Sequence, residues 1–242
     1  MVRTTVFYEG RGYTLHAPTC DDVVFGVWTK LKKFYEYQAL DKIKKLNLTG
    51  TYIDVGANMG NHSLFFAAEC CAQIVAFEPL LPARKLFYAT MAANGINSIE
   101  IFPSESYDYE ACARIVMVPR AASFVGGIPY VMRQEEVTRN IGHTTCHYNP
   151  NRSNCYTTVT VDDILAEIEV DAPVLIKIDV EGHETDVACG ALRTISKCKA
   201  ILVELMTDAA YNQFAAVVQP LGFTCDHINL CPGWGRTYLW TR

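Results

Sequence analysis

The stretch Thr51-Tyr-Ile-Asp-Val-Gly-Ala-Asn-Met-Gly60 decides the fold that the sequence predicts. It begins as a short, mostly apolar strand, turns at two glycines and leads into a helix-like segment, 62–71. Similar apolar runs follow along the chain and alternate with helix-like segments. Because these runs lack polar alternation, they are typical of parallel strands that helices cover. The sequence therefore predicts an α/β fold, a doubly wound and mostly parallel sheet with helices on both faces.

The predicted elements extend to residue 205. Predicted strands cover residues 4–8, 51–55, 73–77, 114–118, 173–178 and 200–205. Predicted helices cover residues 27–46, 62–71, 82–93 and 184–195, and residues 159–168 are interpreted as a strand, a turn and a helix. Residues 1–50 are interpreted as a lead-in to the same domain, whose main body is 51–242. Residues 140–155 are polar, and we expect a long loop that serves a site.

Composition narrows the class of protein. The chain has 242 residues, of which 50% are hydrophobic and 19% charged, so one substantial core is expected. Its net charge of -5 and the absence of a basic run give no indication of nucleic-acid binding. No apolar stretch is long enough to span a membrane, and the N-terminus lacks the apolar core of a signal peptide. A cytoplasmic protein is the expectation.

Ten cysteines are present, without a C-x-x-C pair. Reduced thiols are therefore expected, and no metal site is predicted. A metal site or a disulfide remains an alternative for two groups of residues: Cys225 with Cys231, and Cys146-His147 with Cys155.

The glycine turn suggests which cofactor the sheet holds. Its G-x-x-x-G spacing is neither the G-x-G-x-x-G that cradles a pyrophosphate nor a P-loop. Asp54 places a carboxylate at the strand end, which suits an amine-bearing ligand better than a phosphate. Glu78 ends the next strand, where an acid can accept hydrogen bonds from ribose hydroxyls. Together they favour S-adenosylmethionine, although Asp54 capping a helix and Glu78 as a solvated strand end remain alternatives.

Three segments resemble the FkbM family of methyltransferases: Tyr52-Ile-Asp-Val-Gly-Ala-Asn-Met-Gly-Asn61, Val75-Ala-Phe-Glu-Pro79 and Ile176-Lys-Ile-Asp-Val-Glu-Gly-His-Glu184. The third is the most specific, and the Tyr35-Glu36 pair lies in the expected order before them. The resemblance covers residues 35–206. It implies a Rossmann-like class I methyltransferase that moves a methyl group from S-adenosylmethionine to oxygen. Its acceptors are typically hydroxyls of sugars, polyketides or other natural products.

The resemblance also implies which residues hold the cofactor. Asp54, Gly56, Asn58 and Gly60 would hold its amino-acid part, in a loop that also includes Ala57 and Asn61. Glu78, followed by Pro79, would bind the ribose. Arg120 and Ala121, after the third strand, would lie beside the adenine. Residues 97–112 look like an insertion before that strand, and Cys146–Cys155 has no counterpart in the family.

Candidate catalytic residues are titratable groups near strand ends. A hydroxyl acceptor needs a base, and Asp179 or Glu181 is the first choice because both follow the strand 173–178. His183 and Glu204 are further candidates, but a merely packed histidine and a structural ion pair are equal alternatives. Glu184 is interpreted as stabilising its helix N-terminus. Lys177 interrupts an apolar strand and needs a partner, either Glu204 or a motif carboxylate. His143 is a candidate substrate contact.

The expected partner is a small-molecule or glycan acceptor. Three other functions are alternatives to methylation of such an acceptor. Methylation of RNA or protein occurs on related folds, but the acidic composition argues against nucleic acid. An NAD-dependent enzyme is disfavoured by the missing G-x-G-x-x-G. A catalytically silent module remains the third alternative.

Overall fold

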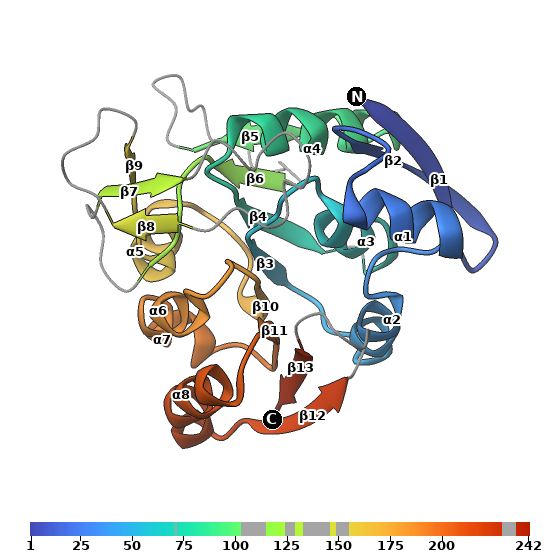
Figure 1. The fold of residues 1–242 in the computed structure, drawn as a ribbon. Coiled ribbons are helices and arrows are strands. Elements are labelled where there is room, and N and C mark those ends of the chain that lie inside the picture. Colours follow the sequence, from blue (N-terminus) through green and yellow to red (C-terminus); the bar gives the residue numbers. More distant parts are fainter. Residues whose placement is uncertain (71, 103–114, 124–128, 133–145, 149–154, 229–235) are drawn as a thin grey trace.

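The computed structural model describes residues 1–70, 72–102, 115–123, 129–132, 146–148, 155–228 and 236–242 (Figure 1). Its centre is an eight-stranded sheet. From one edge to the other the strands are β12 (Thr224–Ile228), β13 (Arg236–Thr241), β11 (Ala200–Leu205), β10 (Pro173–Ile178), β3 (Thr51–Val55), β4 (Gln73–Phe77), β6 (Ile115–Val118) and β5 (Ile99–Ile101). The strands from β11 to β5 are parallel, and β13 is antiparallel to both of its neighbours. The doubly wound, mostly parallel sheet is confirmed.

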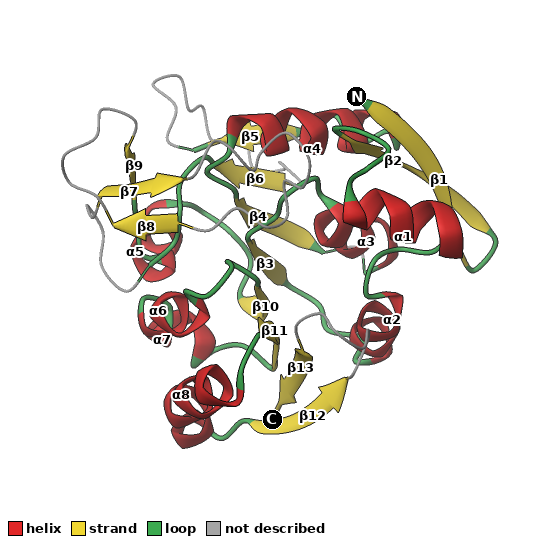
Figure 2. Cartoon of the chain, viewed as in Figure 1, coloured by secondary structure: helices red, strands yellow, loops and turns green. Residues whose placement is uncertain are grey.

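Helices cover both faces of the sheet, as Figure 2 shows. One face carries α1 (Val23–Leu31), α2 (Tyr37–Lys45), α3 (Asn61–Glu69) and α4 (Leu81–Ala93). The other carries α5 (Val161–Glu167), α6 (Glu184–Cys189), α7 (Leu192–Ile195) and α8 (Asp208–Val218), which a 3-10 turn (Gln219–Leu221) follows. Each layer buries its own apolar cluster against the sheet. The sheet is therefore the middle layer of three.

The chain order creates a switch point in the sheet. From β3 the chain passes through α3 to β4 on one side, and β10 later pairs with β3 on the other side. At such a point the connections leave in opposite directions, and ligands of open α/β sheets bind at the carboxyl ends there. The candidate residues named from the sequence lie at these carboxyl ends of the strands, which we call this edge of the sheet.

Two smaller sheets complete the fold. The hairpin of β1 (Val2–Tyr8) and β2 (Arg11–Ala17) packs beside α1 and α4. The second has β7 (Pro129–Met132) between β8 (Cys146–Tyr148) and β9 (Cys155–Thr157). The predicted loop 140–155 thus contains strand residues at 146–148, and His143 lies outside the described residues. No helix among the described ranges is long and apolar enough to cross a bilayer.

Several predicted elements need correction. The helix expected over 27–46 is two helices, because Lys32 ends α1 with a φ of 54° and Glu36 precedes α2 with a φ of 56°. The helix expected over 184–195 is also divided, into α6 and α7. The strands that were not predicted are β2, β5, β7, β8, β9, β12 and β13. The strands at 51–55, 73–77, 173–178 and 200–205 are confirmed.

The reduced state expected of the cysteines stays a prediction. Cys20, Cys70, Cys189, Cys198 and Cys225 form no disulfide with one another. Cys231, the possible partner of Cys225, lies outside the described residues.

Candidate active site

Polar side chains replace apolar ones where four neighbouring strands reach the switch point. The core beneath α1–α4 includes one residue from each strand: Tyr52, Leu175, Leu202 and Leu239. Side chains two positions apart share a face. The residues two positions nearer the site are therefore on the same face: Asp54, Lys177, Glu204 and Thr237. Register pairs Lys177 with Asp54 and Glu204 with Thr237, so these polar groups are lateral neighbours.

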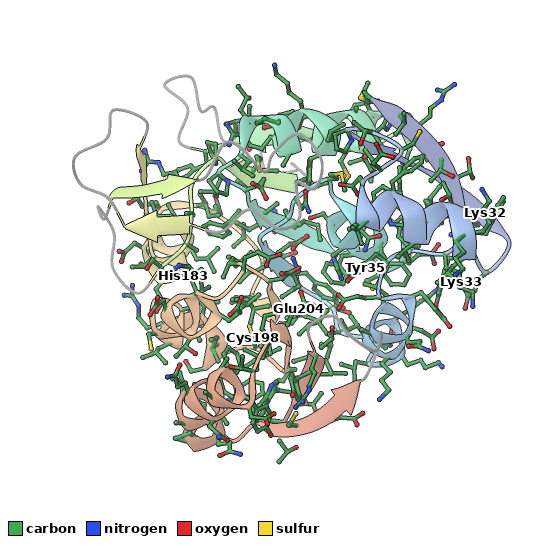
Figure 3. All side chains as sticks on the ribbon, viewed as in Figure 1. Lys32, Lys33, Tyr35, His183, Cys198 and Glu204 are labelled. Atoms are coloured by element: carbon green, nitrogen blue, oxygen red, sulfur yellow. The ribbon has the colours of Figure 1, made fainter. Side chains whose placement is uncertain are left out.

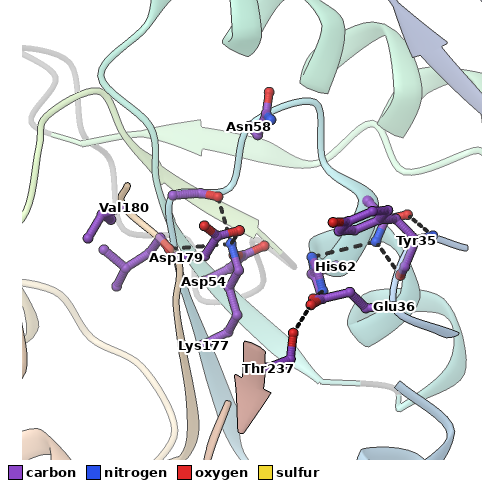
Figure 4. A network of polar contacts seen from close by, with 12 residues as sticks. Tyr35, Glu36, Asp54, Asn58, His62, Lys177, Asp179, Val180 and Thr237 are labelled. Carbon is purple, nitrogen blue, oxygen red and sulfur yellow. Dashed lines mark hydrogen bonds and ion pairs between the residues drawn. The ribbon is translucent and has the colours of Figure 1, made fainter. Parts of the chain in front are cut away.

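Lys177 is the centre of this polar edge (Figure 4). Its Nζ donates to the carbonyl oxygen of Gly56 at 2.7 Å, and lies 3.2 Å from Asp54 Oδ1 and 3.5 Å from Asp179 Oδ2. Burial alone would lower the pKa of this 2% exposed lysine, but Asp54, Asp179 and Glu36 raise it above its usual range. The predicted motif-carboxylate partner is confirmed, and it is joined by Asp54. Lys177 thereby connects β10 to the glycine loop.

Asp54 serves the protein interior. It is 0% exposed, and Ser63 Oγ of α3 donates to its Oδ2 at 2.6 Å while Lys177 neutralises the other oxygen. Oδ1 accepts no hydrogen bond from the residues that the structure describes, although Lys177 Nζ lies 3.2 Å from it. These contacts connect Asp54 to α3 and β10, and its predicted contact with a ligand amine stays a prediction.

The glycine loop requires glycine for backbone packing. Gly56 has a φ of 79°, and a Cβ there would lie 1.8 Å from the carbonyl oxygen of Asp179. Gly60 has a φ of 88°, and a Cβ there would lie 2.7 Å from Met91. Because glycine has no Cβ, the loop can pack directly against the turn that follows β10 and against α4. Between the glycines, Ala57 is buried and its N–H donates to Phe77.

Asn58 is the member of this loop with an unused polar atom. Its φ of 47° is left-handed, a conformation that asparagine tolerates better than most residues. Its buried Oδ1 has no hydrogen-bond partner among the residues that the structure describes. A buried acceptor without a partner is costly, and a ligand donor would satisfy it. Asn58 therefore fits the predicted cofactor role.

Glu78 is held by backbone donors at the end of β4. Asn58 N donates to its Oε2 and Leu80 N to its Oε1, each at 2.8 Å. Burial raises the pKa of Glu78 to about 7, although these two donors oppose the shift. Each carboxylate oxygen can accept a second hydrogen bond, so two acceptor positions remain for neighbouring hydroxyls. This arrangement suits a ribose diol.

The remaining predicted cofactor residues divide into two groups. Pro79 is half-buried, and its carbonyl oxygen accepts from Arg84 at 2.6 Å. Arg120 and Ala121 are half-buried just after β6, whose Val118 oxygen accepts from Glu78 N. These residues thus follow the strand beside Glu78, as the adenine assignment requires.

Asn61 forms hydrogen bonds with two residues of the lead-in segment. Its Oδ1 accepts from Trp28 Nε1 at 3.0 Å and from Tyr35 N at 2.9 Å, and its Nδ2 donates to Tyr35 O at 3.1 Å. The side-chain amide is therefore bonded inside the protein, and the predicted cofactor role of Asn61 stays a prediction. It positions the turn between α1 and α2 against α3.

Asp179, Glu181 and Glu204 bring acidic groups together at the ends of adjacent strands. Asp179 N donates to Val55 O at 3.1 Å, so this turn is anchored to β3. Glu181 has a φ of 57°, and burial followed by Asp179 and Glu184 raises its pKa to about 8. Burial also raises the pKa of Glu204 to about 9, followed by repulsion from Asp179, Glu36 and Glu181. Raised carboxyl pKa values of this kind are typical of functional sites.

His183 and Glu184 have local partners. His183 Nδ1 lies 3.1 Å from Asp186 Oδ2 in the first turn of α6, and Figure 3 shows it apart from Glu204. Glu184 Oε1 accepts from Gly182 N at 2.9 Å and from Val180 N at 3.3 Å. Glu184 thus shapes the turn after β10, and the structure favours the packed alternative for His183.

Four residues of this site were not identified from the sequence: Glu36, His62, Ser63 and Thr237. Glu36 Oε2 lies 2.8 Å from His62 Nε2, and Thr237 Oγ1 donates to Glu36 Oε1. The Tyr35-Glu36 pair was a signal for Glu36, but only the three-dimensional contacts connect it with Glu204. His62 and Ser63 were hidden in an apolar helix.

These features define the class of protein. A doubly wound sheet with antiparallel β13 beside β11 carries a glycine turn after β3 and an acid at the end of β4. This is the fold of class I S-adenosylmethionine-dependent methyltransferases. Fibrillarin from Aeropyrum pernix, with natively bound S-adenosyl-L-methionine, has a similar structure: TM-score 0.52, 9% identity, 99% of this chain and 82% of that chain covered. For a SAM-dependent O-methyltransferase from Thermotoga maritima the values are 0.47, 11%, 99% and 77%.

The sequence gives the family. The model of the methyltransferase FkbM domain matches residues 54–228. The chain belongs to the FkbM methyltransferase family, with S-adenosylmethionine as its cofactor. A search of curated proteins finds no significant relative.

Proposed function

We propose that this methyltransferase acts on a hydroxyl oxygen of a sugar, a glycan or another small natural-product-like acceptor. The observation that carries the proposal is the position of Glu204 beside Asp179, at the ends of adjacent strands. Oxygen acceptors need help to lose their proton, and a half-buried carboxylate with a raised pKa, such as Glu204, is a stronger base than an ordinary carboxylate.

The cofactor would lie along the ends of β3, β4 and β6. Glu78 would accept hydrogen bonds from the ribose hydroxyls, and the free Oδ1 of Asn58 would accept from the amino-acid part. Arg120 and Ala121 would border the adenine. Acidic groups at this edge suit a cationic cofactor and would repel a dinucleotide pyrophosphate.

Glu204 is the proposed general base, with Asp179 as its neighbour. S-adenosylmethionine, when bound, supplies a methyl group on a sulfonium. Glu204 would accept the hydroxyl proton as the acceptor oxygen takes the methyl group from the sulfonium, which would leave as a neutral thioether. Because the pKa of Glu204 is about 9, its ionised form is a stronger base than an ordinary carboxylate. A nearby positive charge would favour that ionised form.

Charge also bears on the acceptor. Hydroxyls of a neutral polyol can form hydrogen bonds with Asp179, Glu181 and Glu204 in either protonation state, whereas a phosphate of RNA would be repelled by each of these groups that is ionised. A neutral hydroxyl compound is therefore the proposed partner, and the proposed location is the cytoplasm.

The test is methyl transfer from isotopically labelled S-adenosylmethionine to separate pools of sugars, glycans, RNA and protein. We expect label in base-stable ethers of hydroxyl compounds, with transfer rising as the pH increases toward 9. Glu204→Gln should lower kcat about 100-fold or more, because a general base contributes that much. Its control is Glu9→Gln, an exposed glutamate on another surface, which should retain wild-type transfer.

Transfer only to RNA or protein would contradict the proposed acceptor. Cofactor binding without transfer to any pool, by wild type as well as variant, would favour the silent module.

A further inference from the structure

We propose that Glu36 is a positioning residue of the acceptor side: clamped by His62 and Thr237, it holds a fixed negative charge beside Glu204 and keeps that carboxyl basic. The inference rests on the proposed role of Glu204. Glu36 is a buried acid of the lead-in segment, 1–50, and it is far in sequence from Glu204, on which it would act.

Glu36 is placed by side-chain contacts with two elements, α3 and β13. Its side chain and that of His62 are each 7% exposed, and Glu36 Oε2 lies 2.8 Å from His62 Nε2 at the start of α3. Its Oε1 accepts from Thr237 Oγ1 of β13. The left-handed φ of 56° directs the chain into α2 at this point. An unfavourable backbone conformation of a bulky residue persists only where surrounding contacts hold it.

Thr237 joins Glu36 to Glu204. It lies directly opposite Glu204 in the antiparallel pairing of β11 and β13, and both side chains are on the α1–α4 face. One oxygen of Glu36 therefore bonds Thr237 of β13, which lies opposite Glu204, while the other faces His62 of α3. Figure 4 shows Glu36 between His62 and Thr237, with the Lys177 cluster beside them.

The charge of Glu36 is stable in this place. Burial would raise its pKa, but hydrogen bonds and charge from His62, the Thr237 hydroxyl and Lys177 lower it below the usual value. The charged and titratable groups that act on Glu204 are Glu36 from the lead-in, Lys177 of β10, and Asp179 and Glu181 after it. From β13, Arg236 pairs with Asp208 at 2.5 Å, and α6 and α8 pack on the opposite face. A permanent anion next to Glu204 opposes its ionisation.

The test needs no acceptor. Protein labelled with ¹³C at glutamate carboxyl carbons is titrated by NMR, and Glu204→Gln identifies the Glu204 signal. In wild type we expect a midpoint near pH 9. Glu36→Gln retains groups that can bond His62 and Thr237 but removes the charge. It should lower the Glu204 midpoint by about half a pH unit or more.

Two further variants separate charge from shape. Glu9→Gln removes a distant exposed charge and should leave the midpoint unchanged. Thr237→Val removes the bridging hydroxyl but keeps both carboxyls, so the midpoint should stay near pH 9. The inference is wrong if the midpoint is unchanged in Glu36→Gln, or if Thr237→Val returns it to the ordinary glutamate range.

This result is independent of the acceptor assay. Methylation of hydroxyls with an unmoved midpoint would overturn the inference alone. The predicted shift without hydroxyl methylation would leave the electrostatic role of Glu36 supported and refute the proposed function.

Discussion

Replacing Lys177 with methionine should lower the free energy of unfolding by about 3–5 kcal/mol, the usual cost of breaking a buried ion pair by removing one partner. Methionine fills a similar volume, but it leaves Asp54 charged at 0% exposure and removes the donor to Gly56 O at 2.7 Å. Asp179 also loses its nearby cation. Urea unfolding at pH 7, followed by circular dichroism, measures the loss.

The origin of this loss can be tested by a second change. Lys177→Met combined with Asp54→Asn removes the uncompensated charge, so it should recover part of the stability. Lys85→Met, at an exposed position of α4, should change stability by no more than about 0.5 kcal/mol. A loss below about 1 kcal/mol in Lys177→Met would show that the buried ion cluster has little structural importance.

Gly56→Ala should destabilise the protein by more than about 3 kcal/mol and prevent it from binding cofactor. Its Cβ would lie 1.8 Å from Asp179 O and 2.9 Å from Asp179 C, so the loop and the β10 turn must separate. The φ of 79° adds strain of about 1–2 kcal/mol. Thermal unfolding and cofactor titration of the same preparation measure both effects.

Gly95 provides the matched control. Its φ of 77° is nearly the same, but a Cβ there meets no atom within 4 Å. Gly95→Ala should therefore cost only the backbone strain, about 1–2 kcal/mol, and leave cofactor binding intact. Equal destabilisation by both alanines would contradict the close packing of Gly56 against Asp179.

The sheet could be predicted because its strands are buried on both faces, which makes them continuous apolar runs. The helix break at Lys32–Glu36 could not, since the apolar spacing continues through it. Local sequence gives no reason for Glu36 to adopt a left-handed φ; its contacts with His62 and Thr237, from distant segments, do. Strand β13 was overlooked for a similar reason, because its place between β12 and β11 depends on pairing with both strands.

The location of the site could be predicted from the sequence, but the partners of its individual side chains could not. Glu78 and Glu204 lie where strand ends were expected to place them. The internal partners of Asp54 and Asn61 could not be predicted, because sequence order does not reveal which side chains an inward-facing group meets. Asp54 finds Lys177 through strand register, and Asn61 finds Tyr35 through packing of the lead-in.

The most direct test of the account is calorimetric titration of S-adenosylmethionine and S-adenosylhomocysteine at pH 8, where Glu78, with a pKa of about 7, is ionised. Wild type should bind with micromolar affinity, about -8 kcal/mol. Glu78→Ala, shown to be folded by circular dichroism, should bind about 100-fold more weakly, because it loses two hydrogen bonds to a charged group. Folded wild type that binds neither compound, or that binds NAD in their place, would contradict the assignment of this edge as the methyl-donor site.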